Sequence, residues 1–459
     1  MLKQTRRQFI TLTAAVGASI AGSSLLAACA PKAAPAPAPE EPKAPVDAPP
    51  AKAPDEKIEI RYSERLEPHG DVMRYASRLY EEMNPHITVI NEPMGWGDTT
   101  TKTPTMVAAG TMQDVSFQHG MFHLPLLGKK GAWLDLTPLA ERDNHDFSIY
   151  WDWSIDSLHM GPQDELVAMP MAVNAGENDL FWNVEMFQDF GIDEPHDQMT
   201  TQQMTEMFIA LQAQLPENAF AMQYGESHLR MEVLTRSFGG HIISADRKSC
   251  GVNLPESKAA HKWIYDLVHD YKAHPARGEG VPQAFYSAMQ ATQFNAASNV
   301  FIGFGPAVEG AWTLGHCTWP RGDGYWGTLP ATNGTVVYSQ TQYPEECWGL
   351  AVLLSSYEVS VWGALSDAHI TPGAIKEAWF DDKVREVCPP YYTAARAWDT
   401  IPSGEFGTLP VPDNARRAEV NDHYNNEWGA VFFGDEPYTD AFFDKLQADI
   451  QEIMDKPLP

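Results

Sequence analysis

The feature that most limits the fold of this chain is a long segment that cannot contribute to a hydrophobic core. Residues 30–57 consist almost wholly of Pro, Ala, Lys, Glu and Asp, a composition that favours an extended, semi-rigid spacer. Folding is therefore confined to a body of about 400 residues that begins at Ile58. Because a single hydrophobic core stops growing at about 250–300 residues, we expect this body to divide into two lobes.

The residues before the spacer resemble an export signal that ends in a lipid attachment site. Arg6 and Arg7 precede a short apolar run, which closes on Leu26-Ala27-Ala28-Cys29. This order is similar to that of a twin-arginine signal joined to a lipobox. The run is too short for a permanent transmembrane helix, and no later apolar stretch is long enough to span a bilayer. An ordinary hydrophobic N-terminal helix is the alternative.

This resemblance predicts where the chain is located. We expect residues 1–28 to be removed as an export signal and residues 29–57 to form a tether that begins at a lipidated Cys29. The body would then be held by lipid at the outer face of the cytoplasmic membrane. The sequence does not decide whether that face meets a periplasm or open medium.

Charge and cysteine content exclude some partners and leave one question open. The formal net charge of −29 repels nucleic acid and anionic lipid headgroups, so neither is an expected partner. An anionic ligand would need a local basic pocket. The four remaining cysteines form disulfides in a pairing that the sequence does not reveal, or stay as free buried thiols; they are Cys250, Cys317, Cys347 and Cys388.

Hydrophobic periodicity predicts strands alternating with helices along the body. Strand patterns cover residues 58–62, 86–90 and 115–117, and helical spacing covers residues 72–83, 103–109 and 121–131. Further helices are predicted at residues 202–215, at residues 255–271 and from Thr439 onward. Such alternation is typical of an α/β sheet with helices on its faces.

Several short motifs, in order, resemble one protein family. Ala108-Ala109-Gly110-Thr111 is followed by Asp114-Val115, then by Gly131 to Pro138, Asp164 to Pro170, Phe181-Trp182-Asn183 and Trp348 to Val352. Their order is similar to that in bacterial extracellular solute-binding proteins of the sugar-binding, maltose-binding-protein-like class, the capture subunits of ABC importers. The resemblance spans most of Ile58 to Met454.

The resemblance implies a fold, a set of lobe boundaries and a mode of action. The expected fold is α/β and periplasmic-binding-protein-like, with two α/β lobes joined by a hinge of crossing segments near Pro170, Ala297 and Gly349. The N-terminal lobe would comprise residues 58–169 and 297–348, and the C-terminal lobe residues 170–296 and 349–459. A monomer would bind a small-molecule ligand, expected to be a sugar, in the cleft and deliver it to ABC permease subunits.

Sugars need an aromatic platform together with planar polar side chains, because their apolar faces are ringed by hydroxyl groups. Trp312 is the first candidate platform, because the resemblance places its segment at the cleft. Trp96, in a loop after a strand, is the second, and Trp348, in a segment expected to be a crossing strand, is the third. An ordinary core position is the alternative for each tryptophan.

The polar candidates follow the ends of predicted strands, where open α/β sheets hold ligands. A role in a turn or a helix cap is the alternative for each of them. Arg65 with a nearby lysine would instead suit a carboxylate or phosphate. The set comprises Glu64, Arg65, Gln118, His119, Asn174 and Tyr224.

Motifs for catalysis or metal binding are not evident. His119 and His123 lie four apart without a further metal ligand, and the acidic loop of Asp143, Asn144 and Asp146 lacks the Gly and Glu of a calcium loop. We therefore expect no enzyme activity, metal or cofactor. A binding protein for an anionic or polyol solute such as a glycerol phosphate, a surface glycan hydrolase and a receptor that only signals remain as alternatives.

Overall fold

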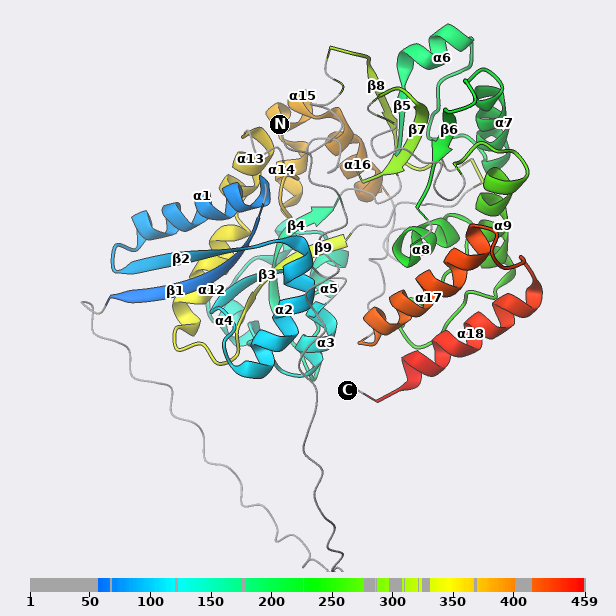
Figure 1. Cartoon of the computed structure of the whole chain (residues 1–459). Coiled ribbons are helices and arrows are strands. Elements are labelled where there is room, and N and C mark those ends of the chain that lie inside the picture. The colour runs from blue at the N-terminus through cyan, green and yellow to red at the C-terminus, as the bar shows by residue number, and fades with distance from the viewer. Residues whose placement is uncertain are drawn as a thin grey trace, which may run out of the picture. The chain divides into compact units, whose positions relative to one another are not determined.

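The structure is a computed structural model of the whole chain. It describes residues 57–66, 68–119, 123–174, 179–225, 227–275, 285, 287–296, 308, 310–320, 322–323, 331–366, 370–400 and 415–457. The expected export signal, the lipidated Cys29, the tether up to residue 56 and the crossing segment near Ala297 lie outside these residues. The described part contains two β-sheets, each with its own helices (Figure 1).

The first sheet has five strands in the order β2-β1-β3-β9-β4. Strands β1, β2 and β3 run parallel, and β9 runs antiparallel between β3 and β4. The strand β9 comes more than 150 residues after β4 in the sequence, so the sheet is completed by a distant segment. Its strands are β1 (Ile58–Arg65), β2 (Ile87–Met94), β3 (Val115–His119), β4 (Ala168–Asn174) and β9 (Ala331–Val337).

The second sheet has four strands in the order β6-β7-β5-β8. Strands β6 and β7 are parallel, and β5 is antiparallel to both of its neighbours, β7 and β8. The alternation of strands and helices predicted an α/β fold, and the two mixed sheets confirm it. The strands are β5 (Asp179–Asn183), β6 (Phe220–Gln223), β7 (Gln290–Asn295) and β8 (Leu314–Cys317).

Helices surround the first sheet and complete the first hydrophobic core. Helix α1 packs on β1 and β2, and α12 packs on β9, β4 and α1. The buried side chains of this core extend to Tyr391 and Ala395 in α16. Its helices are α1 (Pro68–Met83), α2 (Trp96–Ala109), α3 (His123–Lys129), α4 (Thr137–Arg142), α5 (Asp152–Asp156), α12 (Pro344–Leu354), α13 (Tyr357–Leu365), α14 (Lys376–Phe380), α15 (Asp382–Val387) and α16 (Pro389–Thr400).

The second core joins the second sheet to the last two helices of the chain. Helix α8 packs against α9 and α17, and α17 packs against α18. Trp428, Phe432 and Phe443 are fully buried in this core. The helices are α6 (Val184–Phe190), α7 (Thr201–Gln212), α8 (His228–Ser237), α9 (Pro255–His269), α17 (Arg417–Phe432) and α18 (Asp440–Asp455).

The cores divide the chain differently from the expected lobe boundaries. Residues 349–400 were expected in the C-terminal lobe, but their buried side chains belong to the first core. Strand β8 was expected in the N-terminal lobe, yet it pairs with β5 in the second sheet. Along the described chain, β4 thus belongs to the first sheet, β5 to β8 to the second, β9 to the first again, and α17 and α18 to the second core. The core into which a segment packs depends on contacts with residues far away in the sequence, and the order of motifs along the chain does not reveal those contacts.

Side-chain caps define the start of several helices. Thr200 caps α7, because its side chain accepts from the backbone N–H of Gln203, whose own side chain accepts in return from Thr200. Thr439 caps α18 in the same manner through the backbone N–H of Phe442. The helix predicted from Thr439 onward is thus confirmed. Within the described residues no single helix is long and apolar enough to cross a bilayer; α12 and α13, bent by 49°, meet that criterion only as a pair.

Candidate ligand-binding site

The polar candidates of the first lobe come together at one edge of the first sheet. Strands β1, β3 and β4 are mutually parallel, so Arg65, His119 and Asn174 all lie at carboxyl ends of strands on the same edge. Glu64 and Gln118 are the residues just before two of these ends. Trp96 begins α2 directly after β2, which also ends at this edge next to Arg65. The structure thus places six of the sequence-derived candidates on one rim.

Glu64 is buried and held by one partner. Its side chain is 2% exposed, and one carboxylate oxygen forms an ion pair with Arg74 of α1. The other oxygen, Oε2, has no hydrogen-bond partner among the described residues. Burial raises the pKa of Glu64, and Arg74 opposes that shift. One carboxylate oxygen on the rim is therefore left for a hydrogen-bond donor.

Two amide side chains occupy the centre of the same edge. Gln118 is 1% exposed and donates through Nε2 to the hydroxyl of Ser116, at 2.8 Å. Asn333 lies opposite His119 in the pairing of β9 with β3, and its Oδ1 is buried without a partner in the described part of the chain. The sequence analysis missed Asn333, because a single Asn within a strand carries no local signal that its side chain will be buried without a partner.

The corresponding edge of the second sheet contains Tyr224 and Asn295. Tyr224 follows β6, and Asn295 is the last residue of β7, which runs parallel to β6. Strand β5 starts at the same edge, because its first residue, Asp179, pairs with Asn295. Tyr224 is 2% exposed, donates its hydroxyl proton to the carbonyl oxygen of Arg230 at 2.7 Å and packs edge-to-face on Phe294. Its hydroxyl therefore fixes the start of α8.

The first turn of α8 adds basic residues that the sequence analysis did not identify. His228 is fully buried, and neither of its ring nitrogens has a hydrogen-bond partner in the described residues. Burial, reinforced by the charge of Arg417, lowers the pKa of His228 well below its usual value. Arg230 donates to Oδ1 of Asn295 at 3.2 Å. The strand-to-helix turn after Tyr224 was the available signal, but only Tyr224 was chosen from it.

The other two tryptophan candidates lie elsewhere. Trp312 precedes β8 next to the Asn183 end of β5, which is the end opposite Asp179 and Asn295. Its half-buried ring packs edge-to-face on Phe285 at a centroid distance of 5.0 Å, and its indole nitrogen is buried without a partner among the described residues. The structure therefore does not bring Trp312 to the edge that holds Tyr224.

Trp348 occupies a helix and not the expected crossing strand. It lies in α12, is 3% exposed and donates its indole N–H to Asp143 at 2.8 Å. The hydrogen bond with Arg142, together with that from Trp348, lowers the pKa of Asp143 to about 2. The apolar run around Trp348 is buried against the first sheet as a helix, so its hydrophobicity reflects packing and not a strand.

The described cysteines and possible metal-ligating side chains are candidates for a second site. The four described cysteines are free and buried. No group of three or more His, Cys, Asp or Glu side chains that could hold a metal occurs in the described ranges. His119 and His123 lie at the end of β3 and the start of α3.

Comparison with known proteins identifies a family and a fold. The family model described as bacterial extracellular solute-binding protein matches residues 77–383. None of the curated proteins matches the sequence significantly. Among solved structures, an ABC substrate-binding protein from Listeria monocytogenes, Lmo0181, in complex with cycloalternan is similar, with a TM-score of 0.71 and 18% identity over 87% of this chain and 99% of that one.

Two further structures have the same fold. The sugar-binding protein MalE from Xanthomonas citri has a TM-score of 0.71 and 15% identity, covering 86% of this chain and 97% of its own. UgpB from Mycobacterium tuberculosis in complex with glycerophosphocholine has a TM-score of 0.72 and 14% identity, covering 86% and 98%. The likeness confirms the expected two-lobed α/β fold.

Proposed function

Because the chain belongs to the family of bacterial extracellular solute-binding proteins, we propose that it captures a carbohydrate and delivers it to the permease of an ABC importer. The observation that carries the proposal is a pair of buried oxygens at one edge of the first sheet, Oε2 of Glu64 and Oδ1 of Asn333, which have no hydrogen-bond partner among the described residues. A ligand rich in hydroxyl groups offers a hydrogen-bond donor to each of these two acceptors. Similar folds that bind cycloalternan or are named sugar-binding proteins support a carbohydrate.

We further propose that binding works by closure of the two lobes. Along the described chain, β5 to β8 of the second sheet come between β4 and β9 of the first, so the lobes can move against each other while the chain remains continuous. A ligand that contacts both strand edges favours the closed form, because it binds that form better than the open one. No covalent step is needed.

The decisive experiment is a titration of the protein with mono- and oligosaccharides, followed by tryptophan fluorescence and calorimetry. Asn333→Ala is expected to lower the affinity for the best-bound sugar about tenfold, because the variant loses a hydrogen bond between the protein and a sugar hydroxyl. Thr332→Ala is the matched control: the neighbouring side chain points to the other face of β9 and donates to Ser154 at 3.1 Å. If no sugar produces a response, the carbohydrate proposal fails; if both variants bind the sugar equally, Asn333 is not part of the site.

An anionic solute such as a glycerol phosphate is the second candidate. Arg230 lies in the first turn of α8, the charge of Arg417 acts on the same turn, and Arg65 ends β1 on the rim of the first sheet. One similar fold binds glycerophosphocholine. Arg65→Ala would abolish binding of a glycerol phosphate, whereas Arg61→Ala, on the same strand and paired with Glu92, would not. Binding of phosphate esters without any sugar would favour this candidate.

Lipid anchoring completes the proposal. We propose export by the twin-arginine route, processing before Cys29 and attachment of lipid to that residue. The Cys29→Ser variant should then appear in the soluble fraction of the cell envelope, while the unaltered protein sediments with membranes. Mass spectrometry of the mature N-terminus measures the modification directly, and an unmodified Cys29 would contradict it.

A further inference from the structure

Helix α13 is apolar on both faces, although only one of them is enclosed. Its inward face packs into the first core through Val359, Gly363 and Ala364, which are buried. Its outward face presents Val361, Trp362 and Leu365, which are only partly buried, next to Tyr357, which is 37% exposed. A helix that is apolar all round is normally covered on every side. The outward face of α13 is therefore apolar but is not fully covered by the rest of the described structure.

This face forms one wall of a surface groove against α1. The groove has a volume of about 470 Å³ and is lined by Tyr75, Tyr357, Glu358, Val361, Trp362 and Leu365. The rings of Tyr75 and Trp362 are stacked in parallel, with centroids 4.3 Å apart and planes inclined by 2°. The aromatic floor is thus contributed by two helices that already pack together in the first lobe.

Carboxylates surround the aromatic floor. Glu358 accepts a hydrogen bond from the hydroxyl of Tyr75 at 3.0 Å, and Asp381 accepts one from the hydroxyl of Tyr357 at 2.8 Å. Glu377 also acts on Tyr357 electrostatically, and Glu82 acts on Tyr75.

Among the described residues, two cations oppose these four carboxylates, Arg78 near Tyr75 and Lys383 near Asp381. Burial, with the neighbouring Glu358 and Glu82, raises the pKa of Tyr75, and only Arg78 acts in the opposite direction. The rim of the groove is therefore acidic, as is the protein as a whole, with its net charge of −29. Such a surface attracts basic partners and repels anionic lipid headgroups.

We infer that the groove between α1 and α13 is a docking site for a short, positively charged amphipathic segment of a partner protein. Apolar side chains of the segment would cover Val361, Trp362 and Leu365, and its Lys or Arg side chains would pair with Glu358 and Asp381. The residues that line the groove are far fewer than the roughly 20–30 residues a side of a standard interface, so the contact would be transient. The surface is distinct from the strand edges proposed to hold the solute.

The test uses the purified full chain and two synthetic helical peptides of equal length and apolar content. One peptide carries Lys on its polar face and the other carries Glu. We expect the Lys peptide to bind with a change in tryptophan fluorescence and the Glu peptide not to bind. Trp362→Ser should weaken the Lys peptide about tenfold, because buried aromatic anchors contribute most of the energy of such contacts. Glu358→Gln should weaken it mainly at low salt.

Matched controls separate docking from general attraction to an acidic protein. Tyr271→Ala removes an aromatic ring that is 44% exposed in the other lobe, and Glu436→Gln removes an exposed charge there. Both should leave the affinity unchanged. Equal affinities for all variants would show nonspecific attraction and overturn the inference. Binding of anionic lipid vesicles that is lost in Trp362→Ser would also overturn it, in favour of a membrane contact. Urea unfolding of each variant verifies that the fold is retained.

Discussion

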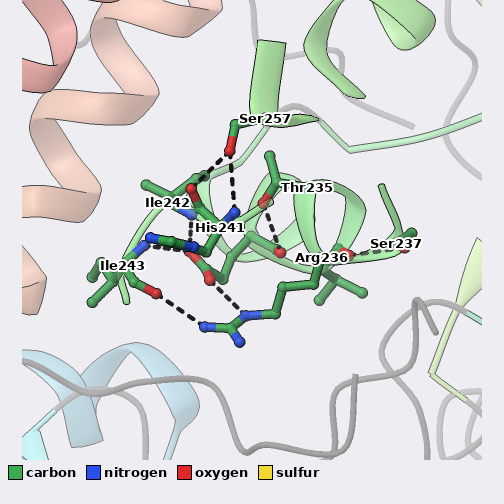
Figure 2. A network of polar contacts seen from close by, with 9 residues as sticks. Thr235, Arg236, Ser237, His241, Ile242, Ile243 and Ser257 are labelled. Carbon is green, nitrogen blue, oxygen red and sulfur yellow. Dashed lines mark hydrogen bonds and ion pairs between the residues drawn. The ribbon is translucent and has the colours of Figure 1, made fainter. Parts of the chain in front are cut away.

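Replacing Glu232 tests the polar network at the centre of the second core. Glu232 is 0% exposed and accepts three hydrogen bonds: from Nε of Arg236 at 2.8 Å and from the backbone N–H groups of Ile242 and Ile243 at 3.0 Å each. Arg236 also donates to the carbonyl oxygen of Ile243 at 2.9 Å, as Figure 2 shows. One carboxylate thus links α8 to the turn at residues 239–243.

The expected cost follows from what remains after the carboxylate is removed. Glu232→Ala leaves the guanidinium of Arg236, which is 1% exposed, without its countercharge and leaves two backbone donors without an acceptor. Breaking a buried ion pair by removing one partner costs about 3–5 kcal/mol. Since a domain is stable by only about 5–15 kcal/mol, the variant should lose much of the stability of its second lobe.

The assay is urea unfolding followed by circular dichroism, and α9 supplies a matched control. Lys262 and Asp266 form an ion pair with the same spacing, but the side chain of Lys262 is 50% exposed. Asp266→Ala should therefore cost no more than about 1 kcal/mol. Glu232→Gln keeps the shape and one acceptor, so it should fall between the two. If Glu232→Ala costs no more than Asp266→Ala, our account of this network is wrong.

Two further predictions concern titratable groups in the cores. Burial raises the pKa of the Cys250 thiol to about 12 and also raises the pKa values of the Cys317, Cys347 and Cys388 thiols. Ellman's reagent at pH 8 should therefore label none of these four cysteines until urea unfolds the chain. Rapid labelling of the native protein would contradict their burial. Burial, with the charge of Arg65, lowers the pKa of His69 to about 3, and burial lowers that of His261 to about 4. Below the unfolded pKa of about 6.5 only the unfolded chain takes up these protons, so each histidine should reduce the free energy of unfolding by about 2 kcal/mol between pH 7 and pH 5. His69→Gln should make the pH dependence shallower; a slope equal to that of the unaltered protein would refute the assignment.

Local sequence signals predicted elements better than they predicted packing. Capping and periodicity indicated α18 from Thr439, and alternation indicated β1 from Ile58, because those signals act within a few residues. The helix around Trp348 was mistaken for a strand, since it is apolar on both faces and its period is therefore weak. The placement of residues 349–400 in the first core depends on contacts with strands far away in the sequence.

The sequence predicted which strand ends form the candidate site, but it did not predict the burial and hydrogen bonding of the side chains there. Polar residues after strand ends were expected near one another, and the parallel strands place Arg65, His119 and Asn174 on one edge. Asn333 and His228 were missed because the feature that distinguishes them, burial without a hydrogen-bond partner, exists only after folding. Whether any of these side chains binds a solute remains a prediction for the titrations.

The interior position of β9 in the first sheet has a consequence for biosynthesis. Until the ribosome has added residues 331–337, β3 has one open edge and β4 has no partner strand in this sheet, because the strand that pairs with both has not yet been made. Open strand edges pair readily with other chains. A nascent chain shorter than about 330 residues is thus exposed to aggregation, and chaperone occupancy should persist until β9 leaves the ribosomal tunnel.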